Sequence, residues 1–215
     1  WLRSDSQFSK NCLTKGKNSV SWRQTREIRR VEVMKGLTFR LGIVACLLAA
    51  ASVTLAAPVV LTDNNSVARI DPLSTPGMYN WIVFAQNQLN QQWFWFRVAG
   101  MNSEQGINTI SAPTITQPNA RSAYISYNNG SYGVEIDYLL TGFTPGPVNQ
   151  YSDISESITI TNATANPLTF SFFQYSDFDL GGVTGGQTIQ LGRNLRGLFN
   201  EASQTAPGVA LTETV

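Results

Sequence analysis

Carboxylates are the side chains through which this sequence could do chemistry. Asp177 and Asp179 lie two residues apart, directly before the glycine-rich run 181–186. Residues i and i+2 of an extended segment point the same way, and glycines let backbone carbonyls approach the same point. Hard oxygen ligands in that arrangement suit Ca²⁺, so we expect at most a structural calcium ion at Asp177 and Asp179. The simpler alternative is that both acids cap the turn through backbone hydrogen bonds.

Missing residue types exclude most enzyme mechanisms. The chain has no His, its two cysteines are Cys12 and Cys46, and residues 58–215 contain neither Lys nor Cys. These absences remove the commonest general base, thiolate metal sites and Schiff-base chemistry from that part of the chain. Hydrolysis by paired carboxylates remains. We therefore expect no catalysis and no cofactor, and we keep as an alternative a glycoside hydrolase that uses carboxylates such as Glu135, Asp137, Asp177 and Asp179.

Large aromatic rings follow one another in Trp93-Phe94-Trp95-Phe96 and must point to both faces of a strand. One interpretation is a central strand that is covered on both sides. The other is an exposed platform on which Trp93 or Trp95 stacks against a sugar ring. The second interpretation would make the chain a carbohydrate-binding module.

The clearest local signal is a β-hairpin over residues 121–138. Asn129-Gly130 suits the two central positions of a type I′ turn, because both residues tolerate positive φ. A turn centred there pairs Ile125 with Val134, and both side chains face the core. The opposite face then carries Ser122, Tyr124, Glu135 and Asp137.

Short apolar runs separated by turn-prone residues predict an all-β fold. Isoleucines alternate with Ser and Thr over residues 154–161, where Glu156 alone interrupts the apolar face. Residues 195–202 fit one helical turn or irregular chain. The run Val209–Val215 alternates as a strand that would lack a partner. We expect one antiparallel β-sandwich of the immunoglobulin-like or jelly-roll-like kind over residues 57–215, incomplete at its C-terminus.

Residues 34–57, MKGLTFRLGIVACLLAAASVTLAA, have the three parts of a secretory signal peptide. Lys35 and Arg40 form the basic part, an apolar run follows, and small residues stand where a peptidase would cleave. We expect cleavage after Ala56, so that residues 34–56 are removed; a membrane anchor is the alternative. Residues 1–33 lie upstream of this signal, and we expect them to be a non-functional or wrongly translated segment.

Charge divides the chain at the same place. Residues 1–57 hold ten Lys and Arg and three acids, whereas residues 58–215 hold five Arg and eleven acids, a net charge of −6. A lysine-free acidic domain has no electrostatic footprint for nucleic acid. It is also poorly suited to anionic lipid, so we expect membrane contact only through the signal peptide or a missing C-terminal anchor.

Three sequence segments resemble those of a known family: NSVARIDPLSTPGMYNW (65–81), NQLNQQWFWFRV (87–98) and SDISESITITNATANPLTFSFFQYSDFDLGG (152–182). They resemble exported bacterial proteins that usually carry a PEP-CTERM sorting signal, although that signal is absent from this chain. The resemblance implies export from a Gram-negative-type cell and retention at the surface or in extracellular matrix. The resemblance transfers no functional residue. As partners we expect the export and sorting machinery, and extracellular polysaccharide or surface matrix. We therefore expect a non-catalytic exported surface or matrix protein.

Overall fold

Alternation of apolar and polar side chains is what folds this chain into strands. The computed structural model describes residues 10–13, 19–21, 57–144 and 151–214. In β4 (Ser66–Asp71) every second side chain is buried, beginning with Ser66. In β10 (Ser122–Asn128) the buried side chains are Ala123, Ile125 and Tyr127. The same period of two recurs along the chain, and the expected all-β, antiparallel sandwich is confirmed.

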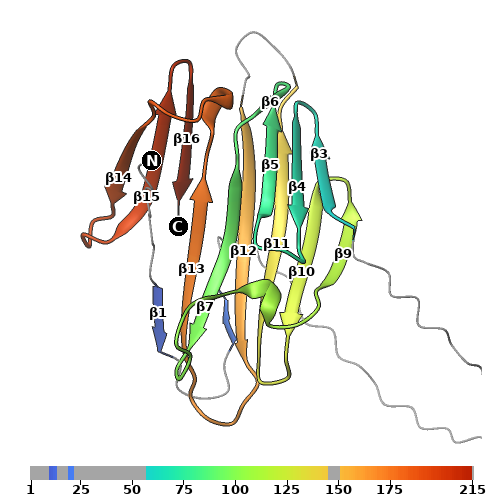
Figure 1. Cartoon of the computed structure of the whole chain (residues 1–215), viewed down its shortest axis with the longest axis vertical. Helices are drawn as coiled ribbons and strands as arrows, with labels where there is room; N and C mark the ends of the chain where they lie inside the picture. The colour runs from blue at the N-terminus through green and yellow to red at the C-terminus, as the bar shows by residue number, and fades with distance from the viewer. Residues whose placement is uncertain (1–9, 14–18, 22–56, 145–150, 215) are drawn as a thin grey trace, which may run out of the picture.

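The strands of the described residues form three sheets (Figure 1). Sheet A has the order β1 (Lys10–Leu13), β13 (Thr169–Asp177), β7 (Gln91–Val98), β5 (Gly77–Val83), β4 and β3 (Val59–Asp63), with β6 (Gln86–Asn87) beside β5 and β8 (Gln105–Gly106) beside β7. Sheet B has the order β2 (Ser19–Ser21), β12 (Ser152–Asn162), β11 (Tyr132–Gly142), β10 and β9 (Thr114–Asn119). Sheet C is β14 (Thr188–Arg193), β15 (Phe199–Ala206) and β16 (Val209–Thr214).

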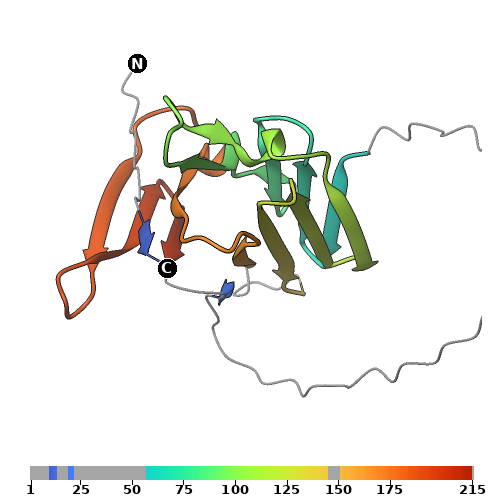
Figure 2. The same ribbon diagram turned by 90° about the horizontal axis from the view of Figure 1, so that it is seen from below.

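Sheets A and B face each other and enclose the core, and sheet C lies at the β13 side of the sandwich (Figure 2). Two short 3-10 turns, η1 (Ile107–Thr109) and η2 (Leu180–Gly182), bury Ile107 and Leu180. Sheet C contacts the core through Ala206, Val209 and Leu211. The sandwich is therefore the main packed body, and sheet C is attached to it by one face.

One margin of the sandwich is joined by hydrogen bonds between the two sheets, and we call it the clasped margin. Asp63, at the end of β3, accepts a hydrogen bond from the Gly142 amide of β11 over 2.9 Å. Asn65 accepts one from the Phe143 amide over 2.9 Å. The Thr62 amide donates to the Ala120 carbonyl over 2.7 Å. These bonds fix the edge strand of sheet A, β3, to the end of β11 and to the turn just before β10 in sheet B.

A seam divides sheet A between β5 and β7. These two strands are parallel, and the only paired positions between them join Gly77 and Met78 to Gln92. Trp93 fills the seam: its side chain is 0% exposed, and a Cβ placed on Gly77 would lie 2.0 Å from Trp93 Cε3. Gly77 has φ +58, which also favours glycine. The indole of Trp93 therefore occupies the space that any side chain at position 77 would need.

The β10–β11 hairpin forms, but its expected register is wrong by two residues. Ile125 pairs with Ile136 rather than with Val134, and four residues, 129–132, connect the paired Asn128 and Gly133. The side chain of Asn128 accepts from the Gly130 amide over 2.7 Å. The side chain of Asn129 accepts from the Ser131 amide over 3.0 Å and from the Tyr132 amide over 3.1 Å. These side-chain bonds stabilise a longer loop than the two-residue turn, while a shift of two keeps each side chain on its expected face.

Two expectations for the C-terminal part of the described chain are wrong, and both concern sheet C. Residues 199–206 form β15, where a helical turn or irregular chain was expected for residues 195–202. The strand that was expected to lack a partner, β16, pairs with β15 along its whole length. Apolar alternation is weak in β15, so its pairing with both neighbours rather than its own pattern makes it a strand.

The segment upstream of the signal pattern contributes two short strands. Lys10–Leu13 pairs with β13, and Ser19–Ser21 pairs with β12. The expected signal peptide and its cleavage site at Ala56 lie outside the described residues. Within the described part, no helix has the length and apolar character needed to cross a membrane.

Candidate functional site

A group of polar side chains lies inside the molecule where the three sheets meet. We call Gln92, Glu156, Gln174, Ser176 and Glu213 the inner polar cluster. They come from β7, β12, β13 and β16. In β7 and β13 the next inward residues are Phe94 and Phe172, whose rings stack at 5.5 Å. The polar groups therefore border an aromatic layer of low polarity.

Hydrogen bonds within the cluster join strands of different sheets. Gln92 Nε2 donates to Glu156 Oε2 over 3.0 Å, which links sheet A to sheet B. Gln174 Nε2 and Ser176 Oγ donate to Glu213 Oε1 over 2.9 and 2.8 Å, which links sheet A to sheet C. Each carboxylate is thus held by amide or hydroxyl donors on the opposite sheet.

Glu156 is the member of the cluster whose carboxyl group is only partly hydrogen-bonded. The residue as a whole is half-buried, but its Oε1 is shielded from solvent and accepts no hydrogen bond from the described residues. The pKa of Glu156 is raised from 4.5 to about 8: burial is the largest cause, the nearby Glu213 carboxylate acts in the same direction, and the hydrogen bond from Gln92 partly opposes them. Glu156 is therefore protonated at neutral pH.

Its neighbours share the same environment. Burial raises the pKa of Glu213 as well, against the lowering effect of the hydrogen bonds from Ser176 and Gln174. Burial raises the pKa of the Tyr138 phenol on β11, and Glu156 and Tyr127 act in the same direction. Two carboxyl groups in one low-polarity space favour holding a proton between them rather than two negative charges.

A carboxyl group with a raised pKa is suited to general-acid chemistry, provided that it faces a substrate. Here the carboxylates accept hydrogen bonds from the cluster's own amides and hydroxyl, and these bonds tie one sheet to another. The donors on the glutamines also point at the carboxylates, which suits a hydrogen-bonded acid better than a bound cation. The arrangement supports a structural role that depends on protonation.

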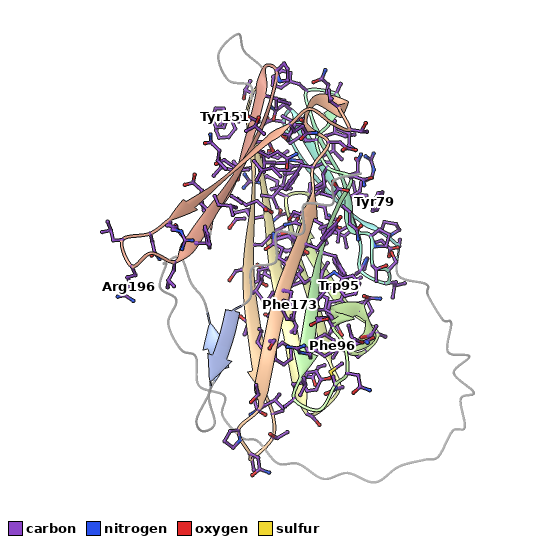
Figure 3. All side chains as sticks on the ribbon, turned by 60° about the vertical axis from the view of Figure 1, so that its left-hand side comes forward. Tyr79, Trp95, Phe96, Tyr151, Phe173 and Arg196 are labelled. Carbon is purple, nitrogen blue, oxygen red and sulfur yellow. The ribbon has the colours of Figure 1, made fainter. Side chains whose placement is uncertain are left out.

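The aromatic strand β7 separates the two tryptophans that were considered for sugar stacking. Trp93 is fully buried in the seam, and its Nε1 donates to Asn108 over 3.1 Å, so it offers no ring face to a ligand in this structure. Trp95 is half-buried and lies directly opposite Phe173 of β13 (Figure 3). Of the two, only Trp95 presents a ring at the surface, beside a second aromatic ring.

The acids proposed as a calcium site take part in loop hydrogen bonds. Asp177 Oδ2 accepts from Asn90 Nδ2 over 3.0 Å, and the Asp179 amide donates to the Gln88 carbonyl over 3.1 Å. Burial raises the pKa of Asp179, and Asp177 adds to this effect. Among the described residues, no three His, Cys, Asp or Glu side chains gather in a way that could hold a metal ion.

The other two acids considered for hydrolysis lie on the outer face of sheet B, as the hairpin pattern predicted. Glu135 is exposed, and Asp137 is half-buried with an Oδ1 that no described group bonds. Burial raises the pKa of Asp137, and Glu135 adds to this effect. These two acids lie on β11, whereas Asp177 and Asp179 lie at the far end of β13, so the four do not form one constellation.

The inner polar cluster was not identified from the sequence, although one signal for it was visible. Glu156 interrupts the apolar face of its strand, and such a residue needs a partner in the interior. Its partner Gln92 and its acidic neighbour Glu213 lie far away in the chain, so only the fold brings the three together. Comparison with known proteins finds no match to this chain among family models, curated proteins or solved structures.

Proposed function

We propose that this chain is an exported, non-catalytic β-sandwich protein that works at the cell surface or in extracellular matrix. The observation that carries the proposal is the position of the signal pattern relative to the fold. The expected cleavage site at Ala56 lies three residues before Val59, where β3 begins. Removal of residues 34–56 would thus leave the core strands of the sandwich intact.

The inner polar cluster supports the non-catalytic part of the proposal. Its carboxylates are engaged by Gln92, Gln174 and Ser176, and its bonds connect sheets. The negative net charge of residues 58–215 adds a reason to exclude nucleic acid as the partner. A surface role is also what the resemblance to PEP-CTERM proteins would imply.

Processing tests the proposal directly. In a Gram-negative host, we expect the exported protein to begin at Ala57 or within two residues of it, as read by N-terminal sequencing. Replacing Leu47 with Arg should abolish export, because a charge in the apolar part blocks recognition of a signal peptide. Leu195→Arg, at an exposed position of the folded domain, is the matched control and should be exported normally. Exported protein that begins at Trp1, or anywhere before Lys35, would contradict the proposal.

Carbohydrate binding is the second candidate function, and the pairing of β7 with β13 favours it. Trp95 and Phe173 are direct cross-strand partners on the outer face of sheet A, and both are half-buried. Two neighbouring rings on one sheet face offer a flat apolar surface of the kind that stacks on sugar rings. The partner would be a surface polysaccharide of the host cell.

Substitution of Trp95 tests this second candidate. If the paired rings bind sugar, Trp95→Ala should weaken binding to purified surface polysaccharide by at least about tenfold, because half of the stacking surface is removed. Binding is measured by depletion of the protein onto the insoluble polysaccharide. Tyr124→Ala, an exposed ring on sheet B, is the matched control and should bind as the unaltered protein does. Equal binding by all three proteins would exclude Trp95 as a sugar contact.

A further inference from the structure

The outer strand of sheet C has a free edge. Among the described residues, β14 pairs only with β15, and it lies on the side of sheet C farthest from the sandwich (Figure 1). Its outer row of backbone amides and carbonyls has no strand partner there. Free edges of this kind readily pair with another strand unless the protein protects them.

The side chains that usually protect an edge are missing from residues 188–192, TIQLG, which contain no charge and no proline. The shift in the register of β14 with β15 lies at the end of the strand, between Gly192 and Arg193. The nearest charge is Arg193, and its guanidinium lies 3.5 Å from the centre of the Phe199 ring. Arg193 Nη1 also donates to the Gly197 carbonyl over 2.6 Å. Arg193 is thus turned back onto its own hairpin and does not guard the edge.

Two apolar side chains are exposed beside the free backbone groups. Ile189 is 45% and Leu191 is 49% exposed, and the two lie on the same face of β14 because they are two residues apart. Thr188 and Gln190 lie on the other face. A strand that pairs with this edge would gain backbone hydrogen bonds and would cover Ile189 and Leu191.

The edge is complementary to itself. If two copies of β14 pair antiparallel about a twofold axis at Gln190, Ile189 of each copy lies opposite Leu191 of the other. The two Gln190 side chains then lie opposite each other and can form hydrogen bonds between the copies. Arg193 lies opposite Gln187, so the register places no like charges together.

We propose that the β14 edge is a self-association surface at which a second copy of this chain pairs antiparallel about Gln190. The pairing joins two three-stranded sheets into one, and it buries four apolar side chains on one face. It leaves the inner polar cluster and the outer face of sheet A uncovered. A protein at a surface or in a matrix would use such contacts to link its copies.

Single cysteines test the register. In the full chain with Cys12 and Cys46 replaced by Ser, Gln190→Cys should form a disulfide-linked dimer under mild oxidation, because the two positions are direct partners. Thr188→Cys is the matched control on the same strand and face. In the proposed register its two copies lie about 13 Å apart and should not be linked. Equal linking of the two variants, or none for Gln190→Cys, would overturn the register.

A charge on the edge tests the association itself. Leu191→Lys should raise the dimer dissociation constant, measured by sedimentation velocity, by at least about tenfold, since it places like charges near each other across the edge. Leu198→Lys, at a 62% exposed position in the hairpin loop, should leave dissociation unchanged. Circular dichroism confirms that both variants fold. An unaltered chain that stays monomeric at its highest soluble concentration would overturn the proposal.

Discussion

Replacing Gly77 with Ala should destabilise the protein by about 3–5 kcal/mol, which is a large share of the stability of a single domain. The new methyl group would lie 2.0 Å from Trp93 Cε3 and 2.6 Å from the Gln92 carbonyl oxygen. The indole is fully buried and cannot move aside without disturbing the seam between β5 and β7. The positive φ of residue 77 adds about 1 kcal/mol. Urea unfolding followed by tryptophan fluorescence measures the loss.

Gly130 provides the control for this prediction. It also has a positive φ, +88, but a Cβ placed there meets nothing within 4 Å. Gly130→Ala should therefore lose only the conformational part, about 1 kcal/mol. If the two variants lost the same stability, steric contact with Trp93 would not be what requires glycine at position 77.

The stability of the protein should fall as the pH rises from about 5 to 9, and Glu156→Gln should remove much of that fall. The pKa of Glu156 is about 8 in the folded protein and 4.5 in its ordinary environment, so the unfolded state loses the proton first. The stabilising contribution of this carboxyl is complete below pH 4.5, and it is lost as the pH rises through 8. Allowing for solvent screening of a half-buried residue, we expect a change of about 2–4 kcal/mol.

The comparison of variants isolates Glu156 from other groups. Glu213 and the Tyr138 phenol face it from β16 and β11, and both remain in the Glu156→Gln variant. The amide keeps an acceptor for Gln92 but carries no charge, so this variant should be more stable than the unaltered protein at pH 9. Asp153→Asn, which replaces an exposed carboxylate on the same strand β12, should follow the unaltered protein across the range. Parallel stability curves for Glu156→Gln and the unaltered protein would contradict the assignment.

Much of the sandwich follows from local sequence pattern, because a period of two fixes which side chains are buried. The hairpin shows where such reasoning ends. Its faces were predicted correctly, but the pairing of Ile125 was wrong, since the side chains of Asn128 and Asn129 stabilise a longer loop. Pattern determines the face of a strand, whereas the register depends on individual hydrogen bonds in the turn.

The inner polar cluster could not be predicted from the sequence in the same way. Glu156 stood out as a polar residue on an apolar face, but nothing local indicates that Gln92 would bond it or that Glu213 would lie near it. Each of the three is on a different sheet, and the pairing order of strands far apart in sequence brings them together. The acids that stood out by their spacing, Asp177 and Asp179, instead bond neighbouring loop groups.

We expect the clasped margin to resist expansion of the interior more strongly than the opposite side of the sandwich does. At that margin, hydrogen bonds that Asp63 and Asn65 accept from the Gly142 and Phe143 amides hold sheet A to sheet B. At the opposite side, sheet C touches the core through one face only, with the bonds of Glu213 among its attachments. We therefore expect any swelling of the interior, whether thermal or caused by a new charge at Glu156, to displace sheet C before it separates sheets A and B at the clasped margin. The compressibility of this protein should be anisotropic, with its softest direction through the sheet that also carries the free β14 edge.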